Sequence, residues 1–485
     1  MTRFAQLTSF TRALGPWSTG DGTLQQRLER AVQSIIERDA WDTAHPLPPD
    51  RVLARTLGVS RTTVIGAYEA LASRELIERR HGSGTYLRER RPVRSSAPRD
   101  LSSVRLAMQF PGGGDEASGA LAVGSMPALD PWVRDALTRA QKSMGSHLRS
   151  HGMSPAGLLE LRERIATYLS DGAMASRPEE VLVTGGSQMA IALVAQLYLK
   201  PGAVVLVEEP AYLGALDVFE QCGARLEGVP VTPQGIDQDA LARAVERLRP
   251  QLIYFSSTGQ NPTGAVMPLA SRRRLARLLD QWQVPALEDL ALAELVIDLD
   301  RPPPPVASFT TRAPIWIAGS VSKLFWSGLR IGWLRAHRSL IDTAARLRLI
   351  SDMGSSPMQQ LAAQFLIEDM DEARKQRRAE LRKRRTLLQA ELVRQLPTWR
   401  WQEPAAGMCL WVDTGEAHTH ALTQIAARHG LMLLPGNTFC LGDGGHSHLR
   451  LAFGAVEPAI REAISRLGKA WHSYRGRSAQ LHAAV

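Results

Sequence analysis

The segment SVSKLFWSGLR, residues 320–330, carries the strongest evidence on the fold of the larger part of this 485-residue chain. Its lysine, Lys323, lies among Val, Leu, Phe and Trp, where desolvation lowers the pKa of the amine and leaves it free to form a Schiff base with an aldehyde. Arg330, seven residues on, offers a planar donor fork for a phosphate, and Ser320 and Ser322 add hydroxyl groups. A single lysine more commonly extends to solvent, so the segment needs support from elsewhere.

Two features earlier in the chain suit the same phosphate-bearing aromatic ligand. Gly186, Ser187 and Gln188 follow a predicted strand and open a predicted helix, whose free backbone N–H groups favour a phosphate. Asp289 stands at the end of another predicted strand, where its carboxylate can pair with a protonated ring nitrogen. Glycine-rich turns and acidic strand caps are both common, so neither feature is specific by itself.

Three further positions complete the candidate pocket. Asn261, in the sequence NPTG, can hydrogen-bond a phenolic oxygen, although NPTG is also an ordinary turn sequence. Tyr212 can stack on a ring or can belong to the core. Arg450 is flanked by apolar residues, and burying an arginine without an anion is costly, so it is a candidate for binding a ligand carboxylate.

Short apolar segments alternate with helical patterns over the middle of the chain. The strands are predicted at 181–184, 203–207, 252–255, 284–287 and 315–317. This alternation predicts a largely parallel sheet covered by helices on both faces. A charged helix at 371–396 and strands near 408–412 and 449–453 then predict a smaller α+β subdomain.

The pattern over residues 21–87 predicts a winged helix-turn-helix. Thr23 caps a first amphipathic helix, Asp50 caps a short helix over residues 51–57 that Gly58 ends, and Ser60 caps the next helix. Two short strands around a glycine-rich turn follow. A helix-turn-helix presents its second helix to the major groove of DNA, whereas two packed helices joined by a tight turn are also common without any role in DNA binding.

The charge of this N-terminal region favours a polyanionic partner. Residues 1–100 hold 16 Arg, no Lys and 11 Asp plus Glu, a net +5 of the chain's +10. Arg61 can make a bidentate contact with guanine, and Thr62 and Thr63 can reach phosphates or a thymine methyl. A solvated basic face is the alternative. The residues predicted to contact DNA are Arg51, Ser60, Arg61, Thr62, Thr63, Tyr68, Arg79, Arg80, His81, Gly82 and Ser83.

Composition excludes several classes of protein. The 44% of apolar and 22% of charged residues are typical of globular proteins. Three widely spaced cysteines form no disulfide framework and no zinc ribbon, so we expect no metal and a reducing, cytoplasmic location. No segment approaches the roughly 20 apolar residues that span a bilayer. We therefore expect no membrane contact.

Taken together, the features from Gly186 to Arg450 resemble the fold-type I aminotransferase family over residues 120–475. The resemblance implies that the cofactor is pyridoxal 5'-phosphate. It also implies that Lys323 forms the Schiff base, Asp289 pairs with the ring nitrogen and Asn261 contacts the phenolic oxygen. The phosphate side would be held by Ser187, Gln188, Ser320 and Arg330, and Arg450 would bind the carboxylate of an amino acid.

Two departures from the family concern tyrosines. Asp289 is followed by Leu-Ala-Leu, where the family usually has a tyrosine shortly after the aspartate. His151 and Gly152 stand where a Tyr-Gly pair usually arrives from the partner subunit. Because both hydroxyl groups are absent, we expect the cofactor to bind but transamination to be inefficient.

The N-terminal region resembles the winged helix-turn-helix of the GntR regulator family almost continuously from residue 23 to 87. One departure is Glu75, where a glycine is expected. GntR-type and aminotransferase-like domains in one chain resemble the MocR/GabR group of bacterial regulators. We therefore expect a DNA-binding domain at 15–87, a linker at 88–119 rich at first in Arg, Pro and Ser, and an effector and dimerisation domain at 120–478.

The resemblance implies a transcriptional regulator that binds a double-stranded DNA operator as a head-to-tail, domain-swapped homodimer. Its effector would be a small amino compound or the B6 vitamer itself, sensed at Lys323 and Arg450. Two alternatives are a working aminotransferase with an accessory DNA-binding domain and a DNA-binding scaffold whose large domain has lost its cofactor.

Overall fold

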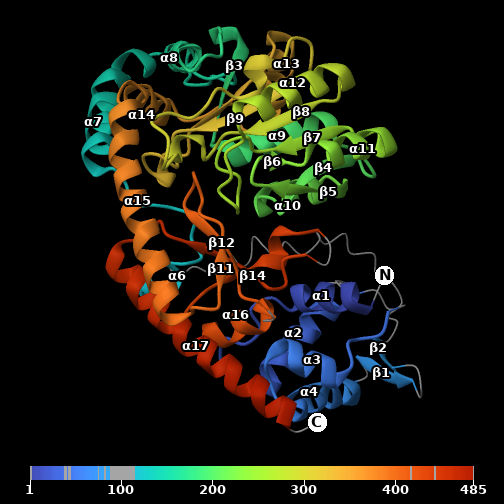
Figure 1. The fold of residues 1–485 in the computed structure, drawn as a ribbon. Coiled ribbons are helices and arrows are strands. Elements are labelled where there is room, and N and C mark those ends of the chain that lie inside the picture. Colours follow the sequence, from blue (N-terminus) through green and yellow to red (C-terminus); the bar gives the residue numbers. More distant parts are fainter. Residues whose placement is uncertain are drawn as a thin grey trace.

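The structure is a computed structural model that describes residues 3–37, 41, 45–74, 76–80, 84–87, 115–415, 418–441 and 444–483. The described residues form a unit of helices and a two-stranded hairpin at the N-terminus, a large domain built on a sheet, and a small subdomain that contacts both (Figure 1). The glycine-rich turn predicted at His81, Gly82 and Ser83, and most of the predicted linker, lie outside the described residues.

The N-terminal unit packs its helices around one apolar core that includes Leu28, Val32, Leu57 and Leu71. The Thr23 hydroxyl accepts from the Gln26 backbone N–H, and the Ser60 side chain accepts from that of Thr63, so both predicted caps are confirmed. The elements are α1 (Arg3–Leu14), α2 (Leu24–Glu37), α3 (Asp50–Leu57), α4 (Arg61–Ser73), β1 (Ile77–Arg80) and β2 (Gly84–Leu87).

The turn between α3 and α4 follows the sequence closely. Gly58 ends α3 in the left-handed region, at φ 62°, where a side chain would be strained. The start of α3 differs by one residue from the prediction, because Pro49 is the N-cap and Asp50 is already helical. The strands β1 and β2 pair antiparallel, as expected for a wing.

The large domain is a sheet of eight strands in the order β3-β10-β9-β8-β7-β4-β5-β6. Strands β4, β5, β7, β8 and β9 pair in parallel, while β10 is antiparallel to both of its neighbours. The strands are β3 (Val181–Thr184), β4 (Val204–Glu209), β5 (Arg225–Thr232), β6 (Gly235–Ile236), β7 (Leu252–Phe255), β8 (Ala286–Asp289), β9 (Ile315–Ser320) and β10 (Gly332–Arg335).

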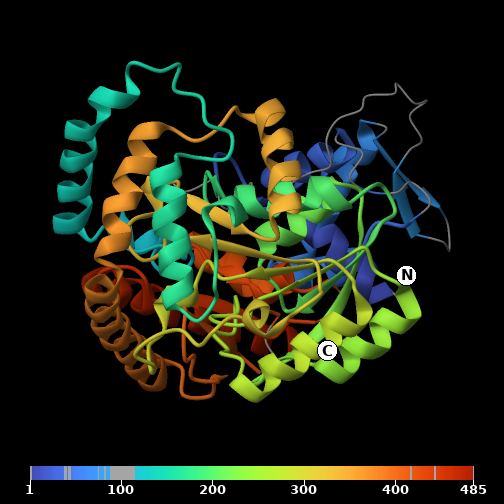
Figure 2. The ribbon, with the colours of Figure 1, turned by 90° about the horizontal axis from the view of Figure 1, so that it is seen from above.

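Helices cover both faces of this sheet, and two separate apolar cores lie on its two sides (Figure 2). These helices are α7 (Asp130–His147), α8 (Leu159–Asp171), α9 (Ser187–Tyr198), α10 (Leu213–Gln221), α11 (Gln238–Leu248), α12 (Leu269–Trp282), α13 (Arg338–Ser351) and α14 (Pro357–Glu368). The predicted α/β architecture is confirmed. The prediction did not include β5, β6 and β10. Of these, β6 and β10 interrupt the strand–helix alternation, because each follows another strand with no α-helix between them.

The small subdomain is a four-stranded antiparallel sheet flanked by helices. The long helix α15 connects it to the large domain, and α17 lies along its outer side (Figure 1). Its elements are α6 (Glu116–Gly119), α15 (Met370–Gln395), β11 (Arg400–Trp401), β12 (Cys409–Asp413), α16 (Thr419–Arg428), β13 (Leu434–Pro435), the 3-10 turn η5 (Gly436–Phe439), β14 (His448–Ala452) and α17 (Glu457–Ala483).

The N-terminal unit lies against the small subdomain of the same chain (Figure 1). Helix α3 packs on α16, and a side chain at Gly58 would meet the Ile425 side chain at 3.2 Å. Arg12 on α1 donates to the carbonyl oxygens of Asn437 and Cys440, at 2.9 and 3.3 Å. This contact joins segments that are more than 420 residues apart in the sequence.

Candidate cofactor and DNA-binding sites

A cavity of about 600 Å³ lies where the large domain meets the small subdomain. Its position beside the ends of β8 and β9 is the usual place for ligands in sheets of this kind. The cavity brings together residues that are far apart in the sequence. Of the predicted cofactor and effector residues, those lining it are Ser187, Tyr212, Asn261, Asp289, Lys323, Arg330 and Arg450.

The Lys323 amine points into this cavity and donates to the Gly124 carbonyl at 2.7 Å. Burial lowers the pKa of Lys323, and the positive charges of Arg450 and Arg330 lower it further. The neutral amine is the form that attacks an aldehyde. The structure therefore supports the chemistry expected of Lys323.

Asp289 is the last residue of β8 and is buried. Its carboxylate accepts from the Tyr254 hydroxyl at 2.7 Å and from the Ala291 backbone N–H at 2.9 Å. Burial raises the pKa of Asp289, while these two hydrogen bonds lower it. A cation placed beside the carboxylate, such as a protonated ring nitrogen, would favour the charged form.

Backbone geometry at the start of α9 suits a phosphate. Gly186 is the N-cap of α9 with φ 104°, and a Cβ there would lie 3.3 Å from the Arg330 guanidinium. The free N–H groups of the first turn, starting at Ser187, and the exposed Arg330 therefore lie together. In this structure Arg330 donates to the Gly185 carbonyl at 2.8 Å.

Two buried atoms in the cavity have no hydrogen-bond partner among the described residues: Asn261 Oδ1 and Arg450 Nε. Arg450 is 6% exposed, donates to the Ala122 carbonyl and stacks over the Phe439 ring at 5.2 Å. Unpartnered buried polar atoms are costly, so they indicate places that a ligand would satisfy. They fit a phenolic hydroxyl that donates to Asn261 Oδ1 and a carboxylate that accepts from Arg450 Nε.

Three of the side chains predicted to bind the cofactor do not line the cavity. The Ser320 and Ser322 hydroxyls both donate to the Ile331 carbonyl, at 3.0 and 3.3 Å, and so fix the loop that carries Lys323. The Gln188 side chain accepts from the Tyr212 hydroxyl at 2.9 Å. The polar groups of these side chains already have partners within the protein. They therefore hold neighbouring residues of the cavity in place and do not face it themselves.

Several residues of the site carry no signal in the local sequence and were not predicted. Tyr254 stands in the middle of a buried apolar strand, and nothing in the local sequence marks its hydroxyl as a partner of Asp289. Ser256, Ser327 and Cys409 also line the cavity. Where the family usually has tyrosine, Ala291 and Leu292 line the cavity and offer no hydroxyl group.

The helix-turn-helix places part of the predicted DNA-contacting set at the surface. Arg51, Ser60, Arg61 and Thr62 are exposed at the starts of α3 and α4. The Arg61 side chain is 59% exposed, and its guanidinium pairs with Asp50 at 2.8 Å. The Ser60 hydroxyl hydrogen-bonds those of Thr62 and Thr63 at 2.7 and 2.8 Å. These exposed residues can reach a DNA groove.

The prediction for Tyr68 was wrong. Its side chain is 2% exposed, and its hydroxyl donates to the Pro48 carbonyl at 2.9 Å. Burial and the negative charge of Asp50 raise the pKa of the phenol. Tyr68 therefore ties α4 to the loop before α3, and its buried side chain offers almost no surface to DNA. Arg79 and Arg80 lie on β1, the first strand of the wing.

Comparison with known proteins identifies the class. Residues 120–467 match the family described as aminotransferase class I and II, and residues 24–87 match bacterial regulatory proteins of the gntR family. The chain therefore belongs to the class I and II aminotransferase family, a family that depends on pyridoxal phosphate, and carries a gntR-type DNA-binding domain. This confirms both resemblances on which the sequence analysis relied.

Two relatives named as regulators match this chain over most of its length. The HTH-type transcriptional regulator YisV of Bacillus subtilis (strain 168) is 30% identical over 82% of this chain and 85% of its own. The probable rhizopine catabolism regulatory protein MocR of Rhizobium meliloti is 26% identical over 88% of this chain and 89% of its own. This chain thus has the domain composition of MocR-type regulators.

The large domain and small subdomain also match solved structures. One is LysN, an α-aminoadipate aminotransferase from Thermus thermophilus, complexed with N-(5'-phosphopyridoxyl)-L-leucine. It is 27% identical, with a TM-score of 0.69, and the match covers 79% of this chain and 100% of LysN. Among the described residues, no helix is both long and apolar enough to span a bilayer.

Proposed function

We propose that this protein is a transcriptional regulator that senses a small amino compound, or the B6 vitamer itself, through pyridoxal phosphate bound at Lys323. One observation carries the proposal: the same cavity holds the desolvated lysine Lys323 and the buried Arg450, whose Nε has no hydrogen-bond partner among the described residues. The gntR-type domain supports DNA as the output.

The bound cofactor would supply an aldehyde for an incoming amine and a ring that withdraws electrons. The protein residues would hold and orient the reactants. Asp289 would keep the ring nitrogen protonated, Asn261 would bind the phenolic oxygen, and Arg330 with the first turn of α9 would bind the phosphate. Arg450 would bind the carboxylate of an amino acid. The Lys323 amine would accept or release the proton that is exchanged at that nitrogen.

A contact path supports a route from this cavity to the DNA-binding unit. Phe439 lies beneath Arg450, and its carbonyl accepts from the Ala211 backbone N–H at 2.8 Å, next to Tyr212. The same segment provides the carbonyl oxygens that Arg12 binds. We infer that a ligand bound at Arg450 shifts residues 436–441 and so changes how firmly α1 is held. The ligand acts only through its different affinity for the two arrangements.

We also propose a head-to-tail homodimer. Large apolar side chains are exposed after α7 and at the end of α13: Leu148 (73%), Met153, Leu349, Ile350 (85%) and Met353. A β-bridge between Ser154 and Gly354 holds the two segments side by side. An apolar surface of this kind favours burial against another protein, and a second copy would bring two DNA-binding units together.

The test measures DNA affinity by fluorescence anisotropy, with a DNA fragment selected by the full-length protein from a random library. We expect addition of pyridoxal phosphate, or of an amino acid with it, to change the Kd, and Arg12→Gln to keep DNA binding while losing most of this change. A Kd for DNA that stays unchanged on addition of pyridoxal phosphate and of every amino acid would refute the proposal.

An active aminotransferase with an accessory DNA-binding domain is the second candidate, and it is favoured by the full-length match to LysN. Incubation with amino donors and a keto acid separates the two functions. Sustained turnover would support the enzyme, whereas a single turnover or none would support the regulator.

A further inference from the structure

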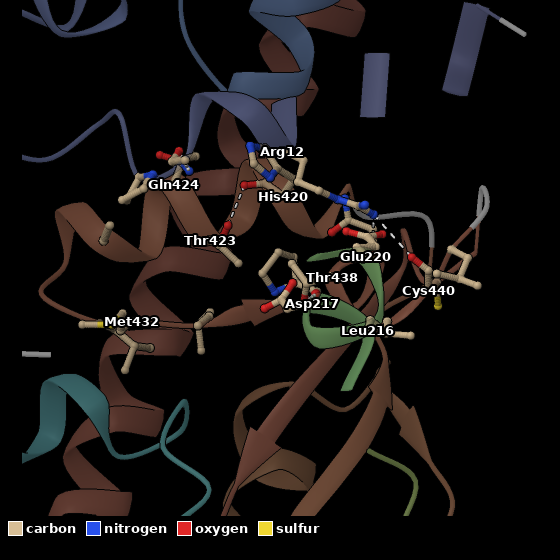
Figure 3. Close-up of a pocket in the computed structure, with 18 of the residues that line it drawn as sticks. Arg12, Leu216, Asp217, Glu220, His420, Thr423, Gln424, Met432, Thr438 and Cys440 are labelled. Carbon is tan, nitrogen blue, oxygen red and sulfur yellow. Dashed lines mark hydrogen bonds between the residues drawn. The ribbon is translucent and has the colours of Figure 1, made fainter. Parts of the chain in front are cut away.

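A second cavity lies where α1 and the following loop meet the small subdomain and α10 (Figure 3). Its volume is about 140 Å³, and it shares no lining residue with the cofactor cavity. Arg12 and Pro16 come from the DNA-binding unit, and Leu216 comes from the large domain. All three parts of the chain therefore contribute to it.

The wall of this second cavity is mainly apolar but holds polar atoms that lack partners. Among the described residues that line it, four buried atoms have no hydrogen-bond partner: Arg12 Nε, His420 Nε2, Gln424 Oε1 and Asn437 Oδ1. Asn437 is 2% exposed and Gln424 is 6% exposed. Figure 3 shows Arg12, His420 and Gln424 gathered on one side of the cavity. Buried polar groups in this state indicate a missing ligand or water.

The charges around the cavity favour an uncharged occupant. Burial and the nearby Arg12 lower the pKa of His420 to about 4, so its ring is neutral. The carboxyl groups of Asp217 and Glu220 on α10 disfavour an anion, while the guanidinium group of Arg12 disfavours a cation. Two amide oxygens require donors, and one guanidinium N–H requires an acceptor. The fourth atom, His420 Nε2, belongs to a neutral ring and can donate or accept according to its tautomer.

We propose that this cavity is a second small-molecule site, which binds a neutral amide carrying a compact apolar body. The amide N–H groups would donate to Asn437 Oδ1 and Gln424 Oε1, and the amide carbonyl would accept from Arg12 Nε. The apolar body would contact the leucines of the wall. An apolar cavity of about 150 Å³ binds benzene, so the space suits a ring of that size as the apolar body, with the amide group placed at the polar atoms of the wall.

The experiment uses benzamide as the probe and the full-length protein loaded with pyridoxal phosphate. Saturation-transfer NMR and calorimetry measure binding, with benzoate and benzylamine as charged controls of similar shape. We expect benzamide to bind, both charged analogues to bind at least about 10-fold more weakly, and the cofactor absorbance to stay unchanged. No benzamide binding would mean that only water occupies the cavity, and a changed cofactor spectrum would place the ligand in the other cavity; either result overturns the proposal.

Asn437→Leu gives the sharper test, because Arg12 binds the backbone carbonyl of this residue and not its side chain. Because Asn437 Oδ1 is buried without a partner, we expect its removal to leave stability largely unchanged. We expect benzamide affinity to fall about 10-fold or more, the value of one hydrogen bond of about 1.4 kcal/mol. Gln376→Leu, at an exposed position of α15, is the matched control. If Asn437→Leu misfolds, Ala427→Met narrows the cavity from α16 instead. Undiminished binding in a folded variant would refute the assignment.

Discussion

Replacing Tyr254 by Phe tests whether Asp289 holds the cofactor ring through its charge. The Tyr254 hydroxyl donates to Asp289 Oδ2 at 2.7 Å, and the only other donor that the described residues give this carboxylate is the Ala291 backbone N–H. Burial already raises the pKa of Asp289 above its ordinary value of 3.8. Without the hydroxyl the pKa rises further, and a smaller fraction of the carboxylate is charged at a given pH.

The size of the effect follows from the hydrogen bond that is lost. A hydrogen bond to a charged group contributes about 1.5–3 kcal/mol. If the charged carboxylate is needed in the cofactor complex, the Kd for pyridoxal phosphate rises about 10- to 150-fold. The sign of the pH dependence is fixed: protonation removes the charge as pH falls, so the loss of affinity grows toward acid pH.

The assay is a titration of cofactor-free protein with pyridoxal phosphate, followed by absorbance, at several pH values. Tyr198→Phe is the matched control, because the Tyr198 hydroxyl contacts Trp316 and does not line the cofactor cavity. An unchanged Kd for Tyr254→Phe, or an equal loss in both variants, would refute the role given to Asp289.

Three further predictions concern the cofactor site and the DNA-binding unit. Lys323→Ala should abolish the borohydride-trappable bond to the cofactor while non-covalent binding persists; an adduct trapped on the variant would contradict this. When the rate of covalent attachment is measured against pH, we expect it to be half-maximal below pH 10.5, the ordinary pKa of lysine. Arg450→Met should move that midpoint upward, because the charge of Arg450 lowers the pKa of Lys323. A midpoint that does not move would count against this coupling. Arg61→Ala should weaken binding to the selected DNA about 10-fold or more and leave the cofactor absorbance unchanged. Asp50→Asn, which frees Arg61 from its ion pair, should not weaken DNA binding. Equal gel-shift affinities of wild type and Arg61→Ala would argue against its place in the groove.

Much of the fold was predictable because its signals are local. The caps at Thr23 and Ser60, the glycine that ends α3 and the alternation of strands and helices depend on neighbours a few residues away. The site residues Lys323, Asp289 and Arg450 were predictable for a related reason, since each carries a charged group within an apolar segment. Such placement is costly unless a ligand or partner compensates for it.

The tertiary structure alone decided which polar groups were already satisfied. Tyr254 and Asp289 are 35 residues apart and meet only because β7 and β8 pair in parallel. Tyr68 was predicted to contact DNA, but its side chain is buried in the packed domain. The hydroxyls of Ser320 and Ser322 were predicted to bind the cofactor, but both donate to a carbonyl within the protein. The contact of Arg12 with residues near 440 likewise depends on how whole domains pack. A sequence determines which groups a chain has, but burial and partners, which set the energy of those groups, exist only once distant segments have come together.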